Sequence, residues 1–201
     1  HRLAEEGGRL WLVEEYVSWP SLAQVGVQLP WELVASAVSR MAEALDFAHQ
    51  QGVIHGNLKP SNVFFDPARG IAKLSDFGLW VAGERSHPLV REGLNTPCPS
   101  YCSLEQLQGG DPAPGWDVYS LGVLAYQMLT GRFPFPGISK HTLQVALLGA
   151  PPPPSQFDRS LPREADRVLL RALAPYSHAR YKSCQELADG LAAALETGSL
   201  R

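Results

Sequence analysis

Apolar residues recur at helical spacing in several stretches of the chain. Over residues 30–51 they fall every three or four positions and form one apolar face, made of Leu33, Ala37, Val38, Met41, Ala44, Leu45 and Ala48. This spacing predicts a long amphipathic helix, with Pro30 in its first turn and Gly52 as its stop. Residues 162–173 and 183–195 predict two further helices.

Two shorter patterns predict β-hairpins. Within residues 1–17, apolar runs flank a Glu-Gly-Gly-Arg sequence at positions 6–9, and a Gly-Gly pair tolerates the positive φ angles of a tight turn. Apolar residues at 63–65 and 71–74 flank an Asp-Pro-Ala-Arg-Gly sequence at 66–70, which is typical of a turn between strands. The two kinds of pattern predict both helices and strand pairs in this chain.

Composition excludes several classes of protein. A chain of 201 residues can bury one sizeable core, or one domain plus a fragment. A net charge of −3 gives no reason to expect nucleic acid or an anionic membrane as partner. No apolar run approaches the roughly 18–20 residues of a membrane span. Cys98, Cys102 and Cys184 have no paired spacing, which predicts thiols outside disulfides in a reducing, cytoplasmic compartment.

The most informative stretch runs from His55 to Asn62 and reads His-Gly-Asn-Leu-Lys-Pro-Ser-Asn; Asp-Phe-Gly follows at 76–78. These sequences resemble the H-R-D-L-x-x-x-N catalytic loop and the D-F-G triplet of eukaryotic-type protein kinases, of the kind found in bacterial serine/threonine kinases. The resemblance covers nearly the whole chain. It implies an α+β, protein-kinase-like fold, with a remnant N-lobe hairpin and hinge over residues 1–17 and a mostly helical C-terminal lobe over residues 18–201. It further implies a catalytic loop at 55–62, an activation segment at 76–105 and a central hydrophobic helix at 117–130.

The resemblance breaks down at the catalytic position. Asn57 stands where the family has its catalytic Asp, and Gly56 stands where the family has Arg. In the family, the carboxylate accepts the proton of the substrate hydroxyl, whereas an amide takes up no proton near neutral pH. Cys98 likewise replaces a threonine that bonds the catalytic Asp and the loop lysine. General-base assistance is worth about 10²–10⁴ in rate, so the sequence predicts impaired phosphoryl transfer.

The residues that hold magnesium in the family are retained. Asn62 and Asp76 occupy the two ligand positions, and carboxylate and amide oxygens are ligands that Mg²⁺ accepts. Lys59 matches the loop lysine that approaches the transferring phosphate. The resemblance therefore implies ATP and Mg²⁺ as cofactors of a site that has lost its base.

The hinge is identified from the same resemblance. The backbone of Glu15 and Val17 would meet the edge of adenine, and Phe64 would lie under its ring. Glu14 falls at a position that is usually apolar and Trp19 at one that is usually glycine, so both are expected to crowd or polarise the adenine pocket. An edge strand with solvent-facing glutamates is the alternative interpretation.

Two parts of the family's phosphate site have no counterpart in this sequence. There is no G-x-G-x-x-G loop, and the lysines, at 59, 73, 140 and 182, all follow His55. The strand lysine that anchors phosphate in kinases therefore has no candidate. Natural loss and truncation both explain this.

Four residues are assigned structural roles by the resemblance. His55 is interpreted as a packing residue rather than a base. Glu105, in the place of the A-P-E glutamate, is expected to pair with Arg180. Asp117 is expected to cap the backbone of the catalytic loop, and a simple helix N-cap is its alternative role.

Three functions follow, in order of preference. The first is a pseudokinase that can still hold Mg-ATP and acts in signalling as a regulatory or scaffold module. The second is an active serine/threonine kinase that tolerates Asn57 and acts on a protein substrate. The third is a structural interaction domain without a ligand. Whether the chain is an enzyme is left open at this level, and the expected partners are a protein substrate or a regulatory protein.

Overall fold

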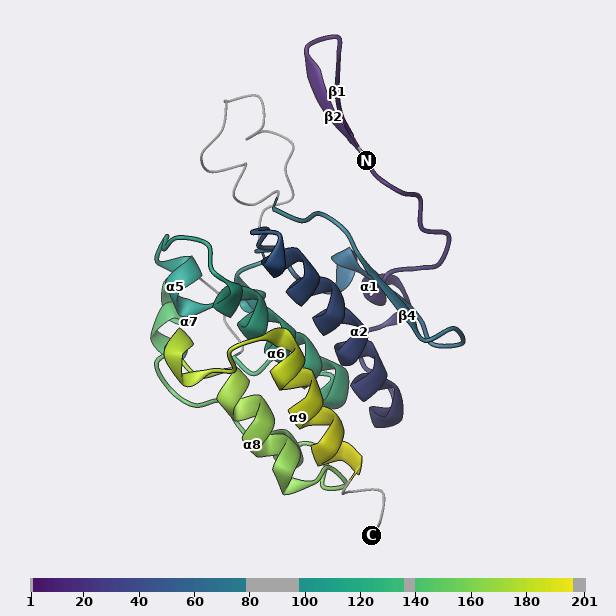
Figure 1. Cartoon of the computed structure of the whole chain (residues 1–201). Coiled ribbons are helices and arrows are strands. Elements are labelled where there is room, and N and C mark those ends of the chain that lie inside the picture. The colour runs from purple at the N-terminus through teal and green to yellow at the C-terminus, as the bar shows by residue number, and fades with distance from the viewer. Residues whose placement is uncertain (1, 79–97, 136–139, 197–201) are drawn as a thin grey trace.

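The computed structural model describes residues 2–78, 98–135 and 140–196, and Figure 1 shows how its elements are arranged. The strands are β1 (Arg2–Glu6), β2 (Arg9–Val13), β3 (Val63–Asp66) and β4 (Ile71–Leu74). The helices are α1 (Leu22–Val25), α2 (Trp31–Gln50), α5 (Leu104–Leu107), α6 (Pro114–Thr130), α7 (Lys140–Ala146), α8 (Arg163–Ala172) and α9 (Cys184–Glu196). Short 3-10 turns lie at Pro60–Asn62, Pro99–Tyr101, Pro154–Gln156 and Ser177–Ala179. The fold is α+β, with helix predominating.

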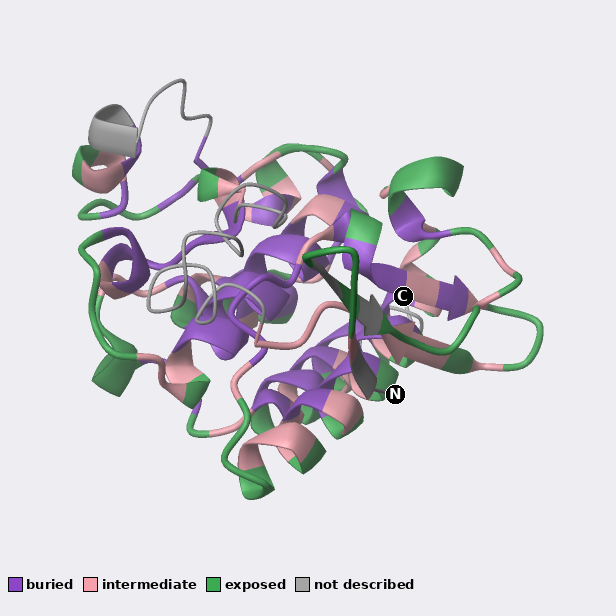
Figure 2. Cartoon of the chain, turned by 90° about the horizontal axis from the view of Figure 1, so that it is seen from above, coloured by how far each residue is buried: buried purple, intermediate pink, exposed green. Residues whose placement is uncertain are grey.

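Helix α6 lies at the centre of the helical body. It is apolar on all sides, as a helix must be when protein surrounds it, and its residues from Trp116 to Leu124 are all buried. Helices α2, α8 and α9 pack against it, and Figure 2 shows buried residues gathered in the middle of the ribbon. At Gly122 an added Cβ would come within 2.8 Å of the Ala172 Cβ, so glycine allows α6 and α8 to approach closely.

The long amphipathic helix is confirmed at 31–50, one residue inside each predicted end. Its buried residues, Val34, Ala37, Val38, Met41, Ala42 and Leu45, follow the spacing of three and four that puts them on one face. This face packs against α6 and α9. Helix α8 lies within the predicted range 162–173. Helix α9 begins and ends one residue later than the predicted range 183–195.

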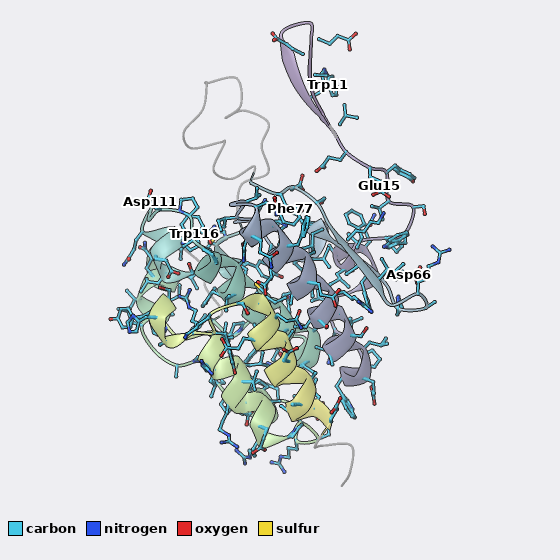
Figure 3. The ribbon with its side chains drawn as sticks, viewed as in Figure 1. Trp11, Glu15, Asp66, Phe77, Asp111 and Trp116 are labelled. Carbon is cyan, nitrogen blue, oxygen red and sulfur yellow. The ribbon has the colours of Figure 1, made fainter. Side chains whose placement is uncertain are left out.

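Both hairpins form antiparallel two-stranded sheets. In the first, Glu6 pairs with Arg9 across the Gly7–Gly8 turn, and both glycines have the positive φ that the turn requires. This hairpin projects away from the helical body, and Trp11 points off it (Figures 1 and 3). In the second, Phe64 lies opposite Lys73, and β4 packs against α2.

The sequence placed some boundaries wrongly. The central helix begins at Pro114 rather than at Asp117, because proline suits the first turn of a helix and the resemblance began only at the aspartate. Of the predicted activation segment, residues 79–97 lie outside the described residues. Within the described parts of the chain, no helix is both long enough and apolar enough to cross a lipid bilayer.

Candidate functional site

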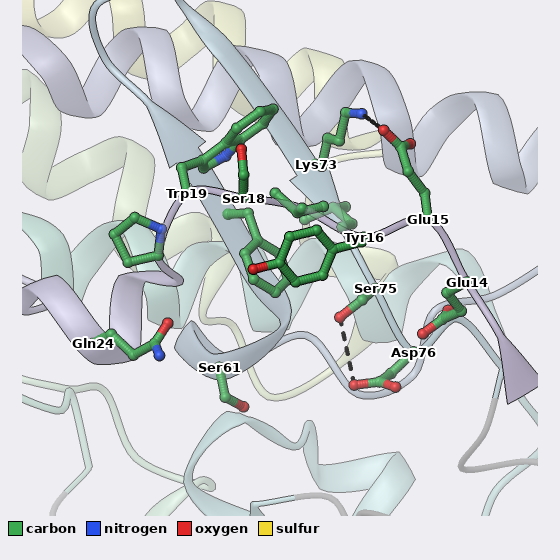
Figure 4. Close-up of a pocket in the computed structure, with 14 residues that line it drawn as sticks. Glu14, Glu15, Tyr16, Ser18, Trp19, Gln24, Ser61, Lys73, Ser75 and Asp76 are labelled. Atoms are coloured by element: carbon green, nitrogen blue, oxygen red, sulfur yellow. Dashed lines mark hydrogen bonds and ion pairs between the residues drawn. The ribbon is translucent and has the colours of Figure 1, made fainter.

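A cavity of about 680 Å³ lies between the segment that follows β2 and the β3–β4 hairpin. Its walls include the predicted adenine-binding residues Glu15, Val17 and Phe64, and the predicted metal ligand Asp76 (Figure 4). Small-molecule sites in proteins commonly enclose about 300–1,000 Å³, so the cavity has the size of a nucleotide site. The fold therefore brings residues from Glu14 to Asp76 of the chain around one cavity.

Lys73 also lines this cavity, although sequence analysis assigned it no role. It forms an ion pair with Glu15, and its ammonium lies 5.6 Å from the centroid of the Trp19 ring. Its position follows from the strand register, because Phe64 and Lys73 are cross-strand partners. The length of the turn between β3 and β4 could have identified Lys73, because it sets the register that pairs Lys73 with Phe64. Glu14 and Trp19 line the cavity as well.

Asp76 is the one non-glycine residue with a positive φ, 63°, in the described part of the chain. Such a conformation costs about 1–3 kcal/mol and persists where the surroundings over-determine it. Here the next residue, Phe77, packs on His55 with 4.4 Å between ring centroids, and the Gly78 N–H donates to the His55 carbonyl at 3.2 Å. These contacts hold the Asp76 carboxylate at the cavity wall.

His55 itself is fully buried. Its Nδ1 accepts a hydrogen bond from the Asn57 N–H at 3.3 Å. Burial lowers the pKa of His55, and the charges of Asp117 and Asp76 act in the opposite direction. The environment therefore favours a neutral, packed imidazole.

Asp117 anchors the catalytic loop to α6. Its carboxylate, which is completely buried, accepts the His55 N–H at 2.9 Å and the Gly56 N–H at 2.8 Å. The helix N-cap is Ala113, so the alternative of a simple N-cap at Asp117 is wrong. His49 from α2 contacts the same carboxylate, with 2.8 Å between Nε2 and Oδ2. One buried aspartate thus fixes the loop backbone immediately before Asn57.

Asn57 and Asn62 are buried, at 4% and 1% exposure. The Asn62 Nδ2 donates to the Asn57 carbonyl at 3.0 Å, and its Oδ1 accepts from the Ser61 hydroxyl at 3.1 Å. Neither asparagine lines the large cavity, whereas Ser61 of the same loop does. Asn57 instead lines a narrow niche that it shares with Cys98. The structure therefore brings Asp76 together with the hinge residues in the cavity lining, whereas Asn57 and Asn62 do not line it.

Lys59 is the cation of the loop. Partial burial lowers its pKa, and Cys98, Asp76 and Cys102 act in the opposite direction. Asn57 and Cys98 stand at the positions where the kinase resemblance expects the base and the threonine that contact this lysine.

Gly56 adopts φ of 67°, a conformation in which most other residues are strained. Its carbonyl accepts a hydrogen bond of 2.7 Å from the buried Gln106 Nε2. Sequence analysis did not single out Gln106, although it directly follows Glu105. The glutamine side chain and Asp117 together hold the loop from two sides.

The predicted ion pair between Glu105 and Arg180 is present. Two guanidinium nitrogens of Arg180 contact the two carboxylate oxygens at 2.6 and 3.0 Å. The remaining donors reach the carbonyls of Ala174, Gly115 and Pro175 at 2.8–2.9 Å. The Arg180 side chain is entirely buried, and each of its three guanidinium nitrogens has a hydrogen-bond partner.

Comparison with known proteins agrees with this geometry. The family model of the protein kinase domain matches residues 1–190. The chain is 36% identical over 192 residues to the serine/threonine-protein kinase Pkn1 of Myxococcus xanthus, covering 93% of this chain and 28% of that protein. It is 36% identical over 185 residues to the serine/threonine-protein kinase drp72 of Corynebacterium efficiens, covering 90% and 35%. It is 32% identical over 191 residues to PknA of Mycobacterium tuberculosis, covering 94% and 43%.

The chain thus spans between a quarter and a half of the length of these curated relatives. The match nevertheless runs from the first hairpin into α9, through the Asp117-anchored loop and the Glu105–Arg180 pair. A family model that matches this much of the sequence, on a fold with these anchors, leads to one assignment: the chain belongs to the protein kinase domain family.

Proposed function

We propose that this chain is part of a pseudokinase: a kinase-shaped module that holds Mg-nucleotide, transfers phosphate poorly or not at all, and acts in signalling as a regulatory or scaffold domain. The observation that carries the proposal is the contrast within one loop. Its backbone is held by Asp117 and Gln106, while the residue at the position of the base, Asn57, is an amide.

The nucleotide part of the proposal is supported by the cavity. Glu15 and Val17 offer main-chain groups to adenine, and Phe64 offers an apolar floor. Asp76 would supply a carboxylate oxygen for Mg²⁺, and Asn62 would complete the metal site by turning its Oδ1 from the Ser61 hydroxyl toward the cation. When bound, Mg²⁺ would neutralise charge on the phosphates.

An active serine/threonine kinase is the second candidate. The relatives named above are called serine/threonine-protein kinases, and Lys59, Asn62 and Asp76 keep the family's residue types. Phosphoryl transfer rests mainly on positioning and charge stabilisation, so these residues favour some transfer to a protein hydroxyl.

Calorimetry of ATP binding with and without Mg²⁺, on the longest natural form of the protein, tests the nucleotide proposal. We expect binding that strengthens when Mg²⁺ is present, and Asp76→Ala should abolish that increment because the cation loses its carboxylate. Lys73→Ala is the matched control, since it changes the same wall without touching the metal ligands. If wild-type protein that is shown to be folded binds no ATP, the domain is a structural interaction module instead.

A further inference from the structure

A second cluster of metal-ligating side chains lies at the junction of α2 and α9. It consists of Asp46 and His49 on α2 and Cys184 at the first position of α9, and their ligand atoms all lie within 4.8 Å of one another. The two helices pack side by side (Figure 1). None of the three residues lines the nucleotide cavity, and the protein kinase assignment gives them no role.

The backbone around this cluster is fixed. Asp46 and His49 are one helical turn apart, so their side chains share a face of α2. The Asp46 carboxylate accepts the Cys184 N–H at 3.0 Å and the Gln185 N–H at 2.9 Å, which places the start of α9 beside α2. Each carboxylate oxygen has two lone-pair sites, so these bonds leave acceptor capacity for a cation.

The imidazole of His49 is already oriented as in a metal site. Its Nε2 lies 2.8 Å from Asp117 Oδ2, and its Nδ1 lies 3.5 Å from Asp46 Oδ1. Histidines that bind metals almost always donate their other ring N–H to a carboxylate or carbonyl, which fixes the tautomer and the ring plane. Asp117 is the carboxylate that contacts Nε2 here, so Nδ1 is the nitrogen left facing Asp46 and Cys184.

The burial of this cluster and the carboxylates around it favour a bound cation. Cys184 is completely buried, and its sulfur lies within 4.8 Å of the ligand atoms of Asp46 and His49. The side chains of His49 and Asp46 keep 9% and 19% exposure, so an ion can reach the cluster from solvent. Two carboxylates around a thiol and an imidazole form a negative site of mixed sulfur, nitrogen and oxygen donors.

We propose that Asp46, His49 and Cys184 form a binding site for a divalent transition-metal ion of the Zn²⁺ type. The donors are a carboxylate oxygen of Asp46, Nδ1 of His49 and Sγ of Cys184, and water completes a tetrahedron. On binding, the cation takes the place of the thiol proton, which leaves to solvent, and His49 binds as the neutral imidazole with its Nε2–H donating to Asp117. Zn²⁺ bonds of about 2.0–2.3 Å put ligand atoms roughly 3.3–3.8 Å apart, so the widest pairs close by about 1 Å.

Such a site would connect three parts of the domain. The cation joins α2 to the start of α9 directly, and His49 joins it to Asp117, which holds the His55 and Gly56 N–H groups of the catalytic loop. Its occupancy therefore stabilises the folded domain and stiffens the loop from behind. At a metal concentration 100 times the Kd, the folding equilibrium constant rises about 100-fold.

Cobalt titration of the chelator-treated chain tests the proposal. We expect one equivalent of Co²⁺ to bind with the intense visible absorption of a tetrahedral site and a near-ultraviolet thiolate-to-cobalt charge-transfer band. Zn²⁺ should then displace the Co²⁺, because nitrogen and sulfur sites prefer Zn²⁺. Cys184→Ala should remove the charge-transfer band and weaken binding by more than the roughly 10–100-fold that losing a partner of a metal ligand costs.

Cys102→Ala is the matched control, because Cys102 is also buried but its sulfur contacts the Cys98 carbonyl, at 3.5 Å. It should keep both the band and the affinity. Cys184→Ser serves as a second variant if the alanine variant fails to fold, as judged by circular dichroism in chelator. The proposal is overturned if wild type shows no charge-transfer band, if the band survives at Cys184→Ala or Cys184→Ser, or if it disappears in Cys102→Ala.

Discussion

Two groups of residues in this kinase domain differ in how well they match the family. One group anchors the fold, and the other lies at the reacting positions. Asp117, Glu105 and Arg180 keep the family's residue types, and each makes several hydrogen bonds to buried groups. Asn57 and Cys98 have departed from the family's types, yet they occupy a niche in the same frame.

The comparison indicates that the residues which stabilise the fold and those at the reacting positions can change independently. An anchor such as Arg180 contributes free energy of folding, because its removal leaves buried partners without a donor. The residue at a reacting position contributes to rate instead. On the proposed function, a chain with an amide at the position of the base still folds as a kinase domain, and the predictions below test that separation on each side.

Arg180→Ala should have the largest effect on stability. The guanidinium has no exposed surface and pairs with Glu105, and breaking one partner of such a pair typically costs about 3–5 kcal/mol. Urea unfolding measures the change in the free energy of unfolding. Arg167→Ala is the matched control, since this arginine pairs with Glu164 while 75% of its side chain is exposed, and exposed pairs contribute about 0–1 kcal/mol. Equal effects of the two substitutions would remove the distinction between anchor and surface pair.

Asp117→Asn should come next, at about 2–3 kcal/mol. The amide keeps one acceptor oxygen for the two loop N–H groups and presents donors where only acceptors fit, and an unsatisfied buried group costs about 1–3 kcal/mol. Hydrogen exchange at the His55 and Gly56 amides should accelerate, because these are the groups that Asp117 holds. Asp189→Asn, which alters an exposed partner of Gln185, serves as the control and should leave both amides unchanged. Slow exchange in both variants would mean that Gln106 alone secures the loop.

Gly56→Ala should cost about 1–2 kcal/mol, the penalty of a left-handed conformation for a residue with a Cβ. An added Cβ would meet the Trp116 ring at 3.8 Å, an ordinary contact, so the cost is conformational rather than steric. Gly149→Ala is a suitable control, because the φ of Gly149 lies outside the left-handed region. A neutral Gly56→Ala would show that the loop relaxes to another backbone conformation.

These anchors could largely be predicted from the sequence, whereas the cavity wall could not. Asp117, Glu105 and Arg180 have roles set by family position, and each role reappears as a contact. Lys73 was missed because its place depends on the register that sets it opposite Phe64. The side-chain direction of Asn62 depends on a hydrogen bond to the Asn57 carbonyl, which no motif specifies.

The same reasoning explains which elements were found. The long helix and both hairpins carry their own signals, a sustained apolar face in one case and glycine-containing turns in the other. Helices α1, α5 and α7 were not predicted, because four to seven residues are too few for a periodic pattern to emerge. The Asp46, His49 and Cys184 cluster joins residues that the fold alone brings together, across 138 positions of sequence.

Asn57→Asp should have the largest effect on rate. The carboxylate has the shape of the amide that it replaces, but the position is 4% exposed, so the buried charge should lower the free energy of unfolding unless a cation pairs with it. If the missing base is the main defect, phosphotransfer from ATP to a protein hydroxyl in the longest natural form should rise by about 10²–10⁴. Asn57→Ala is the control, because it removes the amide without supplying a base. A stable Asn57→Asp variant with no gain in transfer would locate the defect elsewhere, at Glu14 or Trp19 in the cavity wall, and would extend the separation of architecture from chemistry beyond the loop.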